Sequence, residues 1–290
     1  MQYFRIIASL AALMLSISLV GCDQQSAADQ DNRVAIAPAG ADMAGHLQLT
    51  GSSTTAALMQ SIALRYQTLH PNVSITVEMG GAERGINDAR NNKADIGMVS
   101  RLITDKDQYI KGFPVARDGA GFVVHKNNPV TSLSSAQIVG IFSGRIVNWK
   151  MVGGRDAPIV VFKRDEGRGT IAIFTHYFKL SYAAMKAQAI VGENADVIAA
   201  VVAQPNAICL ISVIVAENDS RSGVPIKLIA LNGIAATHAN ILNGDYPLAR
   251  PLTLVTRGLP IGLAKNFIAY SLSPQVADIV EQMGFVPYQE

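Results

Sequence analysis

The stretch HLQLTGSSTTAALMQSIALRYQTL, residues 46–69, contains the pattern that decides the fold. Its alternating apolar residues over 46–50 predict a short strand, and the polar residues 51–55 predict a loop. Apolar residues then recur at helical spacing over 56–69, and Pro71 lies just beyond this predicted helix. The stretch therefore predicts a strand, a polar loop and a helix in direct succession.

The same succession of strand, glycine-containing turn and helix is predicted twice more along the chain. Its members cover 73–79, 80–85 and 86–91 in one case, and 158–163, 164–170 and 171–180 in the other. Further predicted elements are strands over 95–99 and 252–255, and helices over 135–142, 261–272 and 274–283. Strands that alternate with helices predict an α/β architecture.

The N-terminus has the pattern of an export signal. Arg5 precedes an apolar run of 15 residues, 6–20, which is shorter than the roughly 20 residues that span a bilayer. The sequence LVGC, residues 19–22, resembles the lipobox of bacterial lipoproteins, in which the cysteine becomes the acylated N-terminus after cleavage. An ordinary signal peptide that happens to contain a cysteine is the alternative.

On this resemblance, residues 1–21 are a lipoprotein signal peptide and Cys22 carries the lipid. Residues 22–45 are polar and show no steady period, so they are expected to form a flexible tether. Cys209 is the second of the two cysteines and lies in the apolar run 207–211, which predicts a buried thiol of the core.

The charge balance and the scattered histidines exclude several classes of function. The signal contains one of the 24 basic residues and none of the 22 acidic residues, so the mature chain carries a net charge of about +1. Because no basic tract is present, nucleic acid is not an expected partner. The five histidines show no metal-ligand spacing, and the sequence has no Gly-x-Ser-x-Gly motif. Neither a catalytic residue, a metal nor a cofactor is predicted.

Three loops rich in Gly, Ser and Thr precede predicted helices and could bind an anion. Backbone N–H groups and the positive end of the helix dipole attract negative charge there. A single Ser or Thr at such a position is usually only a helix cap. Ligands of open α/β sheets lie beyond the carboxyl ends of the strands, so three loops at the same sheet edge favour a shared site. Arg164 could add a bidentate contact there, with a surface or interdomain salt bridge as the alternative.

Longer motifs resemble the periplasmic phosphate-binding proteins of phosphate ABC transporters. The resemblance runs from TGSST, residues 50–54, to MGFVP, residues 283–287, and IFSGRIVNW, residues 141–149, is its most specific part. It implies the α/β type II periplasmic-binding-protein fold, with two lobes that close by a hinge around a ligand in the cleft between them. The implied lobes cover 46–121 with 235–290, and 122–234.

The resemblance also implies which residues hold the ligand. They are Ser52, Ser53 and Thr54 in the first loop, Gly81 and Ala82 in the second, Ser100 after a strand, and Arg164, Gly167, Arg168, Gly169 and Thr170 in the third. Ala82 and Arg168 stand where the family usually has serine, so each position lacks a hydroxyl. No carboxylate matches the family's acceptor for the phosphate proton, although Glu83, Asp165 and Glu166 are nearby candidates.

The expected function is capture of inorganic phosphate or a related oxyanion for an ABC transporter permease. The protein is expected to be a monomer, anchored by lipid on the periplasmic or cell-surface side of a bacterial membrane. Two alternatives are a binder of sulfate, an organic phosphate or a phosphonate, and a ligand-free, membrane-tethered sensory or interaction module. An enzyme is not predicted.

Overall fold

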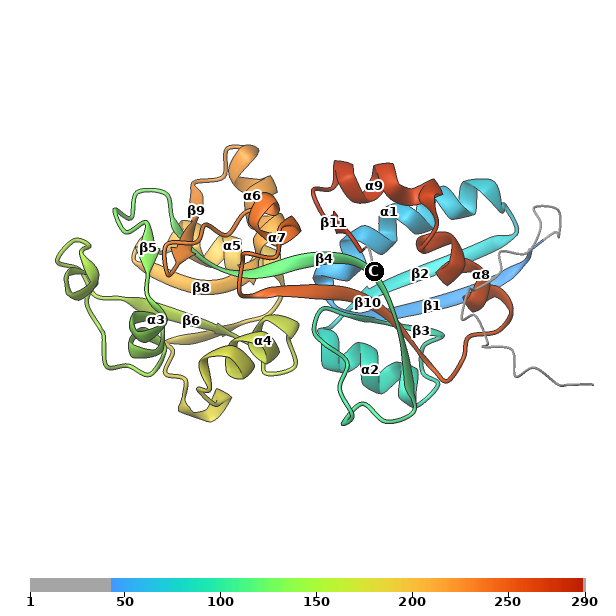
Figure 1. Ribbon diagram of the computed structural model, residues 1–290, viewed down its shortest axis with the longest axis horizontal. Helices are drawn as coiled ribbons and strands as arrows, with labels where there is room; N and C mark the ends of the chain where they lie inside the picture. Colours follow the sequence, from blue (N-terminus) through green and yellow to red (C-terminus); the bar gives the residue numbers. More distant parts are fainter. Residues whose placement is uncertain (1–42, 289–290) are drawn as a thin grey trace, which may run out of the picture. The chain divides into compact units, whose positions relative to one another are not determined.

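Strands and helices alternate along residues 43–288, which the computed structural model describes (Figure 1). The elements are β1 Gly45–Gly51, α1 Ser53–Leu69, β2 Val73–Met79, α2 Ala82–Arg90, β3 Ile96–Val99, β4 Ile110–His125, β5 Ser132–Leu133, α3 Ser135–Phe142, β6 Val160–Arg164, α4 Gly169–Phe178, β7 Ala189–Val191, α5 Asn194–Ala203, β8 Ala207–Ser212, α6 Val213–Arg221, β9 Ile226–Leu231, α7 His238–Leu242, β10 Ala249–Arg257, α8 Gly262–Ser271, α9 Ala277–Gln282 and β11 Val286–Pro287. Short 3-10 helices cover Trp149–Val152, Tyr182–Ala184 and Pro274–Val276. The predicted signal peptide, Cys22 and the tether as far as residue 42 lie outside the described residues. The predicted end of the tether at residue 45 is too late, because Met43 packs against the core and Gly45 begins β1.

The three predicted successions of strand, turn and helix are confirmed, but their helices begin earlier than predicted. α1 begins at Ser53 because the side chain of Ser52 caps it and accepts a hydrogen bond from the Thr55 N–H, at 3.4 Å. α2 and α4 likewise begin at residues that the pattern assigns to turns. These first turns contain glycine or few large apolar residues, so a periodicity argument based on apolar spacing does not detect where the helices start.

Two groups of parallel strands make up most of the sheet. β2, β1 and β3 form the first strand group, and β8, β6 and β7 form the second. β4 joins them, because its residues 110–119 pair with β10 beside the first group and its residues 120–124 pair with β8 of the second. Figure 1 shows β4 and β10 as the long strands that run between the two groups. The α/β fold class is confirmed, whereas the lobe boundaries at 121/122 and 234/235 stay a prediction.

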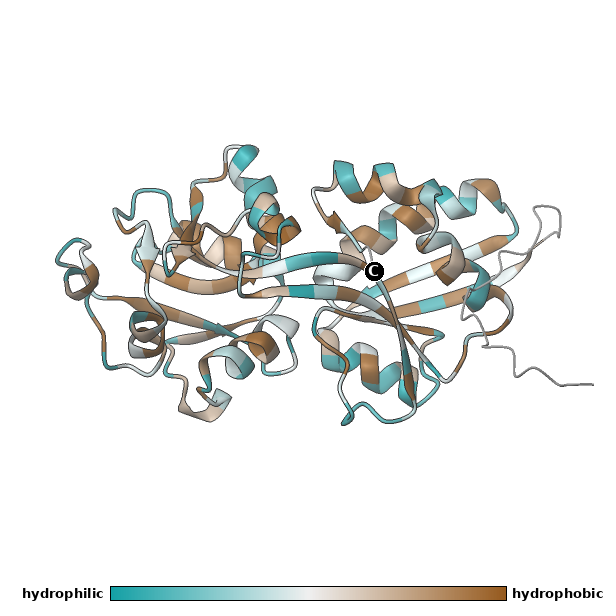
Figure 2. Ribbon diagram, in the orientation of Figure 1, coloured by the Kyte–Doolittle hydropathy of each residue, from teal (hydrophilic) through white to brown (hydrophobic). Residues whose placement is uncertain are grey.

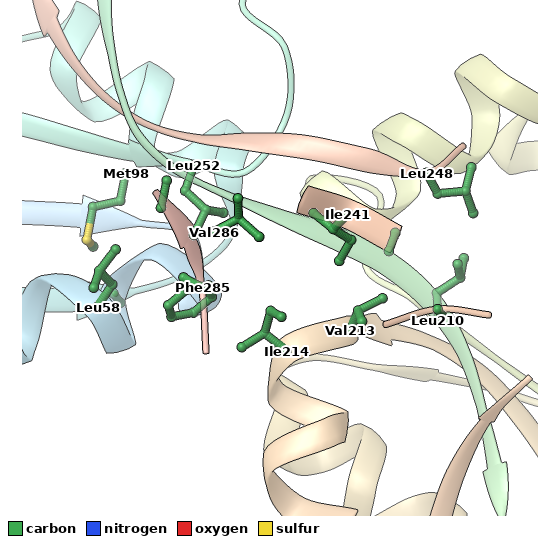
Figure 3. Packing of buried hydrophobic residues seen from close by; sticks show 14 of the residues in the cluster. Leu58, Met98, Leu210, Val213, Ile214, Ile241, Leu248, Leu252, Phe285 and Val286 are labelled. Atoms are coloured by element: carbon green, nitrogen blue, oxygen red, sulfur yellow. The ribbon is translucent and has the colours of Figure 1, made fainter. Parts of the chain in front are cut away.

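One buried hydrophobic cluster extends along the connecting strands into both strand groups. Leu58 and Met98 belong to its part beside β1 and β3, and Leu210 and Val213 belong to its part at β8 and α6. Figure 3 shows Leu252 of β10 in the part of this cluster that lies between those two parts. Figure 2 shows that hydrophobic residues colour much of the strands, whereas hydrophilic residues colour parts of the helices and loops and also stretches of β4 and β10. Both strand groups therefore rest on a common apolar core around β4 and β10.

Cys209 is a buried core thiol, as predicted. It is fully buried and unpaired, and burial raises the pKa of its thiol to about 12. The thiol donates a hydrogen bond to the carbonyl of Leu210, with 3.5 Å between sulfur and oxygen. At neutral pH the side chain is thus a neutral hydrophobic group. Between residues 43 and 288, no helix is long and apolar enough to cross a membrane.

Candidate functional site

A small polar pocket lies where the first turns of α1, α2 and α4 meet the end of β3. It contains about 210 Å³ of atom-free space, part of which is open to solvent. The pocket is small and its lining is almost entirely polar, so it suits a small ion rather than a drug-sized apolar ligand. Its lining consists of Ser52, Ser53, Thr54, Gly81, Ala82, Ser100, Arg164, Arg168, Gly169, Thr170, Asn194 and Arg250.

The pocket brings together all of the predicted site residues except Gly167. The carbonyl of Gly167 instead accepts a hydrogen bond from the N–H of Glu83, at 3.1 Å, beside the pocket. Sequence reasoning did not find Asn194 and Arg250. Asn194 begins a helix that was not predicted, and Arg250 lies just before the predicted strand 252–255. The position of Arg250 beside an apolar strand was the one sequence feature that could have marked it as a site residue. The same feature marked Arg164.

The first loop places Ser52 beside Ser100. Gly51 has a φ of +137°, and a Cβ on it would overlap the carbonyl oxygen of Met98, so glycine permits the close approach of β1 to β3. Ser52 follows and donates a hydrogen bond from its hydroxyl to the Oγ of Ser100, at 2.8 Å. The amides of Ser53 and Thr54 are in the first turn of α1, where helix geometry leaves N–H groups free for a ligand.

The third loop reaches the pocket from the other strand group. It follows β6, whereas the first two loops follow β1 and β2. The strands β3, β10, β4 and β8 separate β1 from β6 in the sheet. The expectation of three loops at one sheet edge is therefore wrong: the loops approach one another from two strand groups. Asn194 also bridges the groups, since its Nδ2 donates to the Thr54 Oγ1 at 3.2 Å.

Gly169, the first residue of α4, touches Ser100 so closely that no other side chain fits. A Cβ at this position would overlap both the carbonyl oxygen and the Oγ of Ser100. The backbone of Gly169 is not left-handed, so alanine fits the helix itself. The glycine is required by the contact between the two strand groups rather than by its own backbone.

Gly169→Ala is expected to weaken anion binding by about 5- to 150-fold. An added methyl group in a packed contact costs about 1–3 kcal/mol, and here it opposes the approach of α4 to Ser100 in the bound state. Titration calorimetry with phosphate measures the change. Gly167→Ala is the matched control, because a Cβ there would lie 3.3 Å from the Cβ of Glu83, a tight contact that a shift of a few tenths of an ångström relieves. Equal affinities of the two variants would contradict the expectation.

Arg164 brings a buried positive charge to the pocket. Its side chain is 2% exposed; the Nε donates to the Gly192 carbonyl at 2.8 Å, and the Nη1 donates to the Asn194 Oδ1 at 3.0 Å and to the Leu210 carbonyl at 3.4 Å. Within the described range, no carboxylate forms an ion pair with Arg164. The alternative of a surface or interdomain salt bridge is therefore wrong.

Burial lowers the pKa of Arg164 to about 10, and the charges of Arg168 and Arg250 act in the same direction. The guanidinium still carries its proton at neutral pH. A buried charge without a counter-charge is unfavourable. An anion in the pocket would supply that counter-charge.

The other two arginines of the pocket have carboxylate partners. The Arg250 Nη2 lies 3.0 Å from the Asp118 Oδ2, and both side chains are buried. Arg168 pairs with Glu193, with 2.6 Å between Nη1 and Oε1, and with Asp165, with 3.3 Å between Nη2 and Oδ2. These carboxylates hold the two arginines in place and leave Arg164 as the uncompensated charge of the pocket.

Several polar atoms of the pocket are buried without a hydrogen-bond partner. They include the Oγ1 of Thr170 and the Nε of Arg250. Such atoms are uncommon in folded proteins because each forfeits its hydrogen bonds to water. A ligand rich in acceptor oxygens would pair the Arg250 donor and could engage the Thr170 hydroxyl. Among residues 43–288, no cluster of side chains has the composition of a metal site.

None of the three carboxylates considered as acceptors for a ligand proton lines the pocket. Glu83 pairs with Arg101, at 2.7 Å between Oε1 and Nε. Asp165 pairs with Arg168, and Glu166 is exposed. The pocket lining itself contains no aspartate or glutamate. Hydroxyl groups, backbone groups, one amide and three arginines therefore make up its polar surface.

Comparison with known proteins shows which family the chain belongs to. The chain matches the family model described as the PBP superfamily domain over residues 36–275. It is 26% identical to the phosphate-binding protein PstS of Bacillus subtilis over 249 residues, which covers 84% of this chain and 81% of the relative. It is 28% identical to the phosphate-binding protein PstS of Borreliella burgdorferi over 250 residues, which covers 83% of this chain and 89% of the relative.

Solved structures show the same similarity. A Clostridium perfringens protein, described as a phosphate ABC transporter substrate-binding protein and solved with bound phosphate, superposes with a TM-score of 0.78 and 30% identity, over 84% of this chain and 100% of the other. An ABC-type phosphate transport receptor from Vibrio cholerae gives a TM-score of 0.68 and 28% identity, over 83% and 100%. The chain therefore belongs to the PBP superfamily, with the two-lobed type II α/β fold of its phosphate-binding members.

Proposed function

We propose that this protein captures inorganic phosphate outside the cytoplasm and delivers it to an ABC transporter permease. The observation that carries the proposal is Arg164, a buried guanidinium in a small pocket with no carboxylate partner among the described residues. An anion of one or two charges would balance it. The names of the similar proteins, phosphate-binding protein and phosphate transport receptor, support phosphate as that anion.

The helix starts around the pocket support the same ligand. α1, α2 and α4 begin at or next to residues of the lining, so N–H groups of their first turns are available to an oxyanion, except the Glu83 N–H, which donates to the Gly167 carbonyl. A tetrahedral ion with four oxygens can accept from several of these donors and from Arg164 together. Binding is expected to use the hydrogen-bond donors of both strand groups, and so to hold the two lobes closed. The lobe boundaries given above are part of this proposal.

Titration of anion-free protein with phosphate tests the function. Bound anion is first removed by unfolding and refolding in phosphate-free buffer. A ligand that binds only the native state stabilises it by about 2.7 kcal/mol at a concentration 100 times Kd, so phosphate should raise the melting temperature and give a calorimetric isotherm. A response to an organic phosphate or phosphonate but not to phosphate would favour that alternative ligand. Failure of every small anion to act would favour a sensory or interaction module.

A lipid at Cys22 is the proposed anchor, because this residue ends the lipobox-like sequence and is followed by the predicted tether. The anchor would hold a monomer beside its permease on the outer side of a bacterial membrane. Cys22→Ser should move the protein from the membrane fraction to the soluble fraction. A variant that fractionates like the parent and has the same mature N-terminus would contradict the anchor.

A further inference from the structure

The pocket has no carboxylate, the side-chain group whose negative charge makes it accept hydrogen bonds and never donate them. A carboxylate can only accept when it is ionised, whereas a hydroxyl can donate its proton or accept another. The lining has hydroxyls at Ser52, Ser53, Thr54, Ser100 and Thr170, and it has no aspartate or glutamate. Which hydrogen bonds these hydroxyls already make decides what they can offer to an oxyanion.

Ser52 and Ser100 form a hydroxyl pair with one proton and one lone pair left over. Together they have two protons and four lone pairs. The bond between them, at 2.8 Å, uses one proton and one lone pair. The Thr55 N–H uses a second lone pair on Ser52, at 3.4 Å, and the Arg250 Nη1 uses another on Ser100, at 3.3 Å. The pair can therefore donate once and accept once.

Rotation of the two hydroxyls reverses the direction of the bond between them. When Ser52 donates to Ser100, the free proton is on Ser100 and the free lone pair is on Ser52. When Ser100 donates to Ser52, these positions are exchanged. The pair can thus accept the proton of hydrogen phosphate at one oxygen while it donates to another.

The two threonine hydroxyls are equally adaptable. The Thr54 Oγ1 accepts from the Asn194 Nδ2 at 3.2 Å, which leaves its own proton free to donate. The Thr170 Oγ1 is buried and has no partner. Each can donate to an unprotonated oxyanion oxygen or accept from a protonated one. The one side-chain amide oxygen of the lining, the Oδ1 of Asn194, already accepts from the Arg164 Nη1 at 3.0 Å. An oxyanion without a proton therefore meets no carboxylate and no other side-chain oxygen that can only accept.

We propose, on the basis of the proposed phosphate-binding function, that this pocket recognises the charge and shape of a tetrahedral dianion and not its proton. A site built to pair with a particular hydroxyl rejects an analogue without it by about 10⁴- to 10⁵-fold, because a buried group is then left unpaired. The adaptable hydroxyls remove that penalty. Sulfate should therefore bind within about 100-fold of hydrogen phosphate, the order of discrimination reached between isosteres that differ by a hydroxyl when no group of the site is built to pair with it.

Titration of anion-free protein with sulfate and with phosphate at pH 8 measures the ratio directly. A phosphate-to-sulfate affinity ratio of about 100 or less supports the inference. A larger ratio overturns it and leaves phosphate capture intact. Absence of phosphate binding would reject the proposed function itself, so the two failures are distinguishable.

Thr170→Asp supplies the fixed acceptor that the pocket lacks. Thr170 is buried at the second position of α4, and three arginines of the lining favour an ionised carboxylate there. Thr170→Asn is the matched control, since it has the same shape without the charge. The phosphate-to-sulfate ratio should be at least about tenfold higher for Thr170→Asp than for Thr170→Asn, because only a protonated oxyanion can pair with the new carboxylate. Equal ratios in the two folded variants would overturn the inference.

Discussion

Replacing Arg164 with glutamine should weaken anion binding by about 30- to 4,000-fold. Loss of one partner from a buried, hydrogen-bonded charge pair costs about 2–5 kcal/mol, and bound anion is the expected partner of this guanidinium. Its hydrogen bonds to the Gly192 carbonyl and the Asn194 amide hold it towards the pocket. Calorimetric titration of anion-free protein with phosphate measures the loss.

Two further variants separate charge from geometry in this experiment. Arg164→Lys keeps the positive charge but lacks the planar fork of donors, so its affinity should fall between those of the parent and Arg164→Gln. Arg145→Gln makes the same charge change at an exposed position and should bind like the parent. If Arg164→Gln folds and binds phosphate with the affinity of the parent, Arg164 does not contact the ligand.

Asp118→Asn should lower the free energy of unfolding by about 3–5 kcal/mol. Asp118 is fully buried, and its Oδ2 lies 3.0 Å from the Nη2 of Arg250, which is also buried. Asparagine preserves the shape but leaves the charge of Arg250 without a counter-charge, which is strongly unfavourable in the interior. Urea unfolding in phosphate-free buffer measures the change, so that ligand does not mask it.

An exposed ion pair is the control for Asp118. Asp278 contacts Arg65 through both carboxylate oxygens, each at 2.6 Å, but both side chains are substantially exposed. Solvent weakens such a pair, so Asp278→Asn should change the free energy of unfolding by about 1 kcal/mol or less. If the two substitutions lower the free energy of unfolding by similar amounts, burial is not the reason that the Asp118–Arg250 pair stabilises the fold.

Local sequence signals predicted the elements whose ends are set by neighbouring residues. The helix over 135–142 matches α3 at both ends, because Ser134 and Gln137 form a capping box at its start and Gly144, with a φ of +77°, follows its end. The predicted helix 274–283 is instead a 3-10 helix followed by α9. Its proline-containing first turn differs from the following α-helical segment, a distinction that apolar spacing did not make.

The elements that escaped prediction lack such signals. α5, Asn194–Ala203, is largely apolar around its circumference, so it has no polar face from which a helical period can be recognised. Its first residue, Asn194, was therefore not considered for the site. The resemblance to a family, and not periodicity, supplied the predicted site residues, and that resemblance did not include Asn194 or Arg250.

The pairing of charges in the pocket could not be predicted from the sequence. Glu193 is 25 positions from Arg168, and Asp118 is 132 positions from Arg250. Such pairs depend on how β4, β6 and β10 pass one another in the sheet. The lack of a carboxylate that matches the family's acceptor stays a prediction from the resemblance. The sequence also contains no sign that the nearby acids Glu83 and Asp165 are engaged with arginines.

The burial of Cys209 gives the protein a built-in chemical reporter. A thiol reagent modifies the thiolate of an accessible side chain, and this thiol is enclosed, with its pKa raised to about 12. Modification therefore requires β8 to open and expose it. The carbonyl of Leu210, next along the strand, accepts a hydrogen bond from Arg164. The labelling rate of Cys209 thus reports how often the strand beside the pocket opens, with or without an anion, and needs no engineered probe.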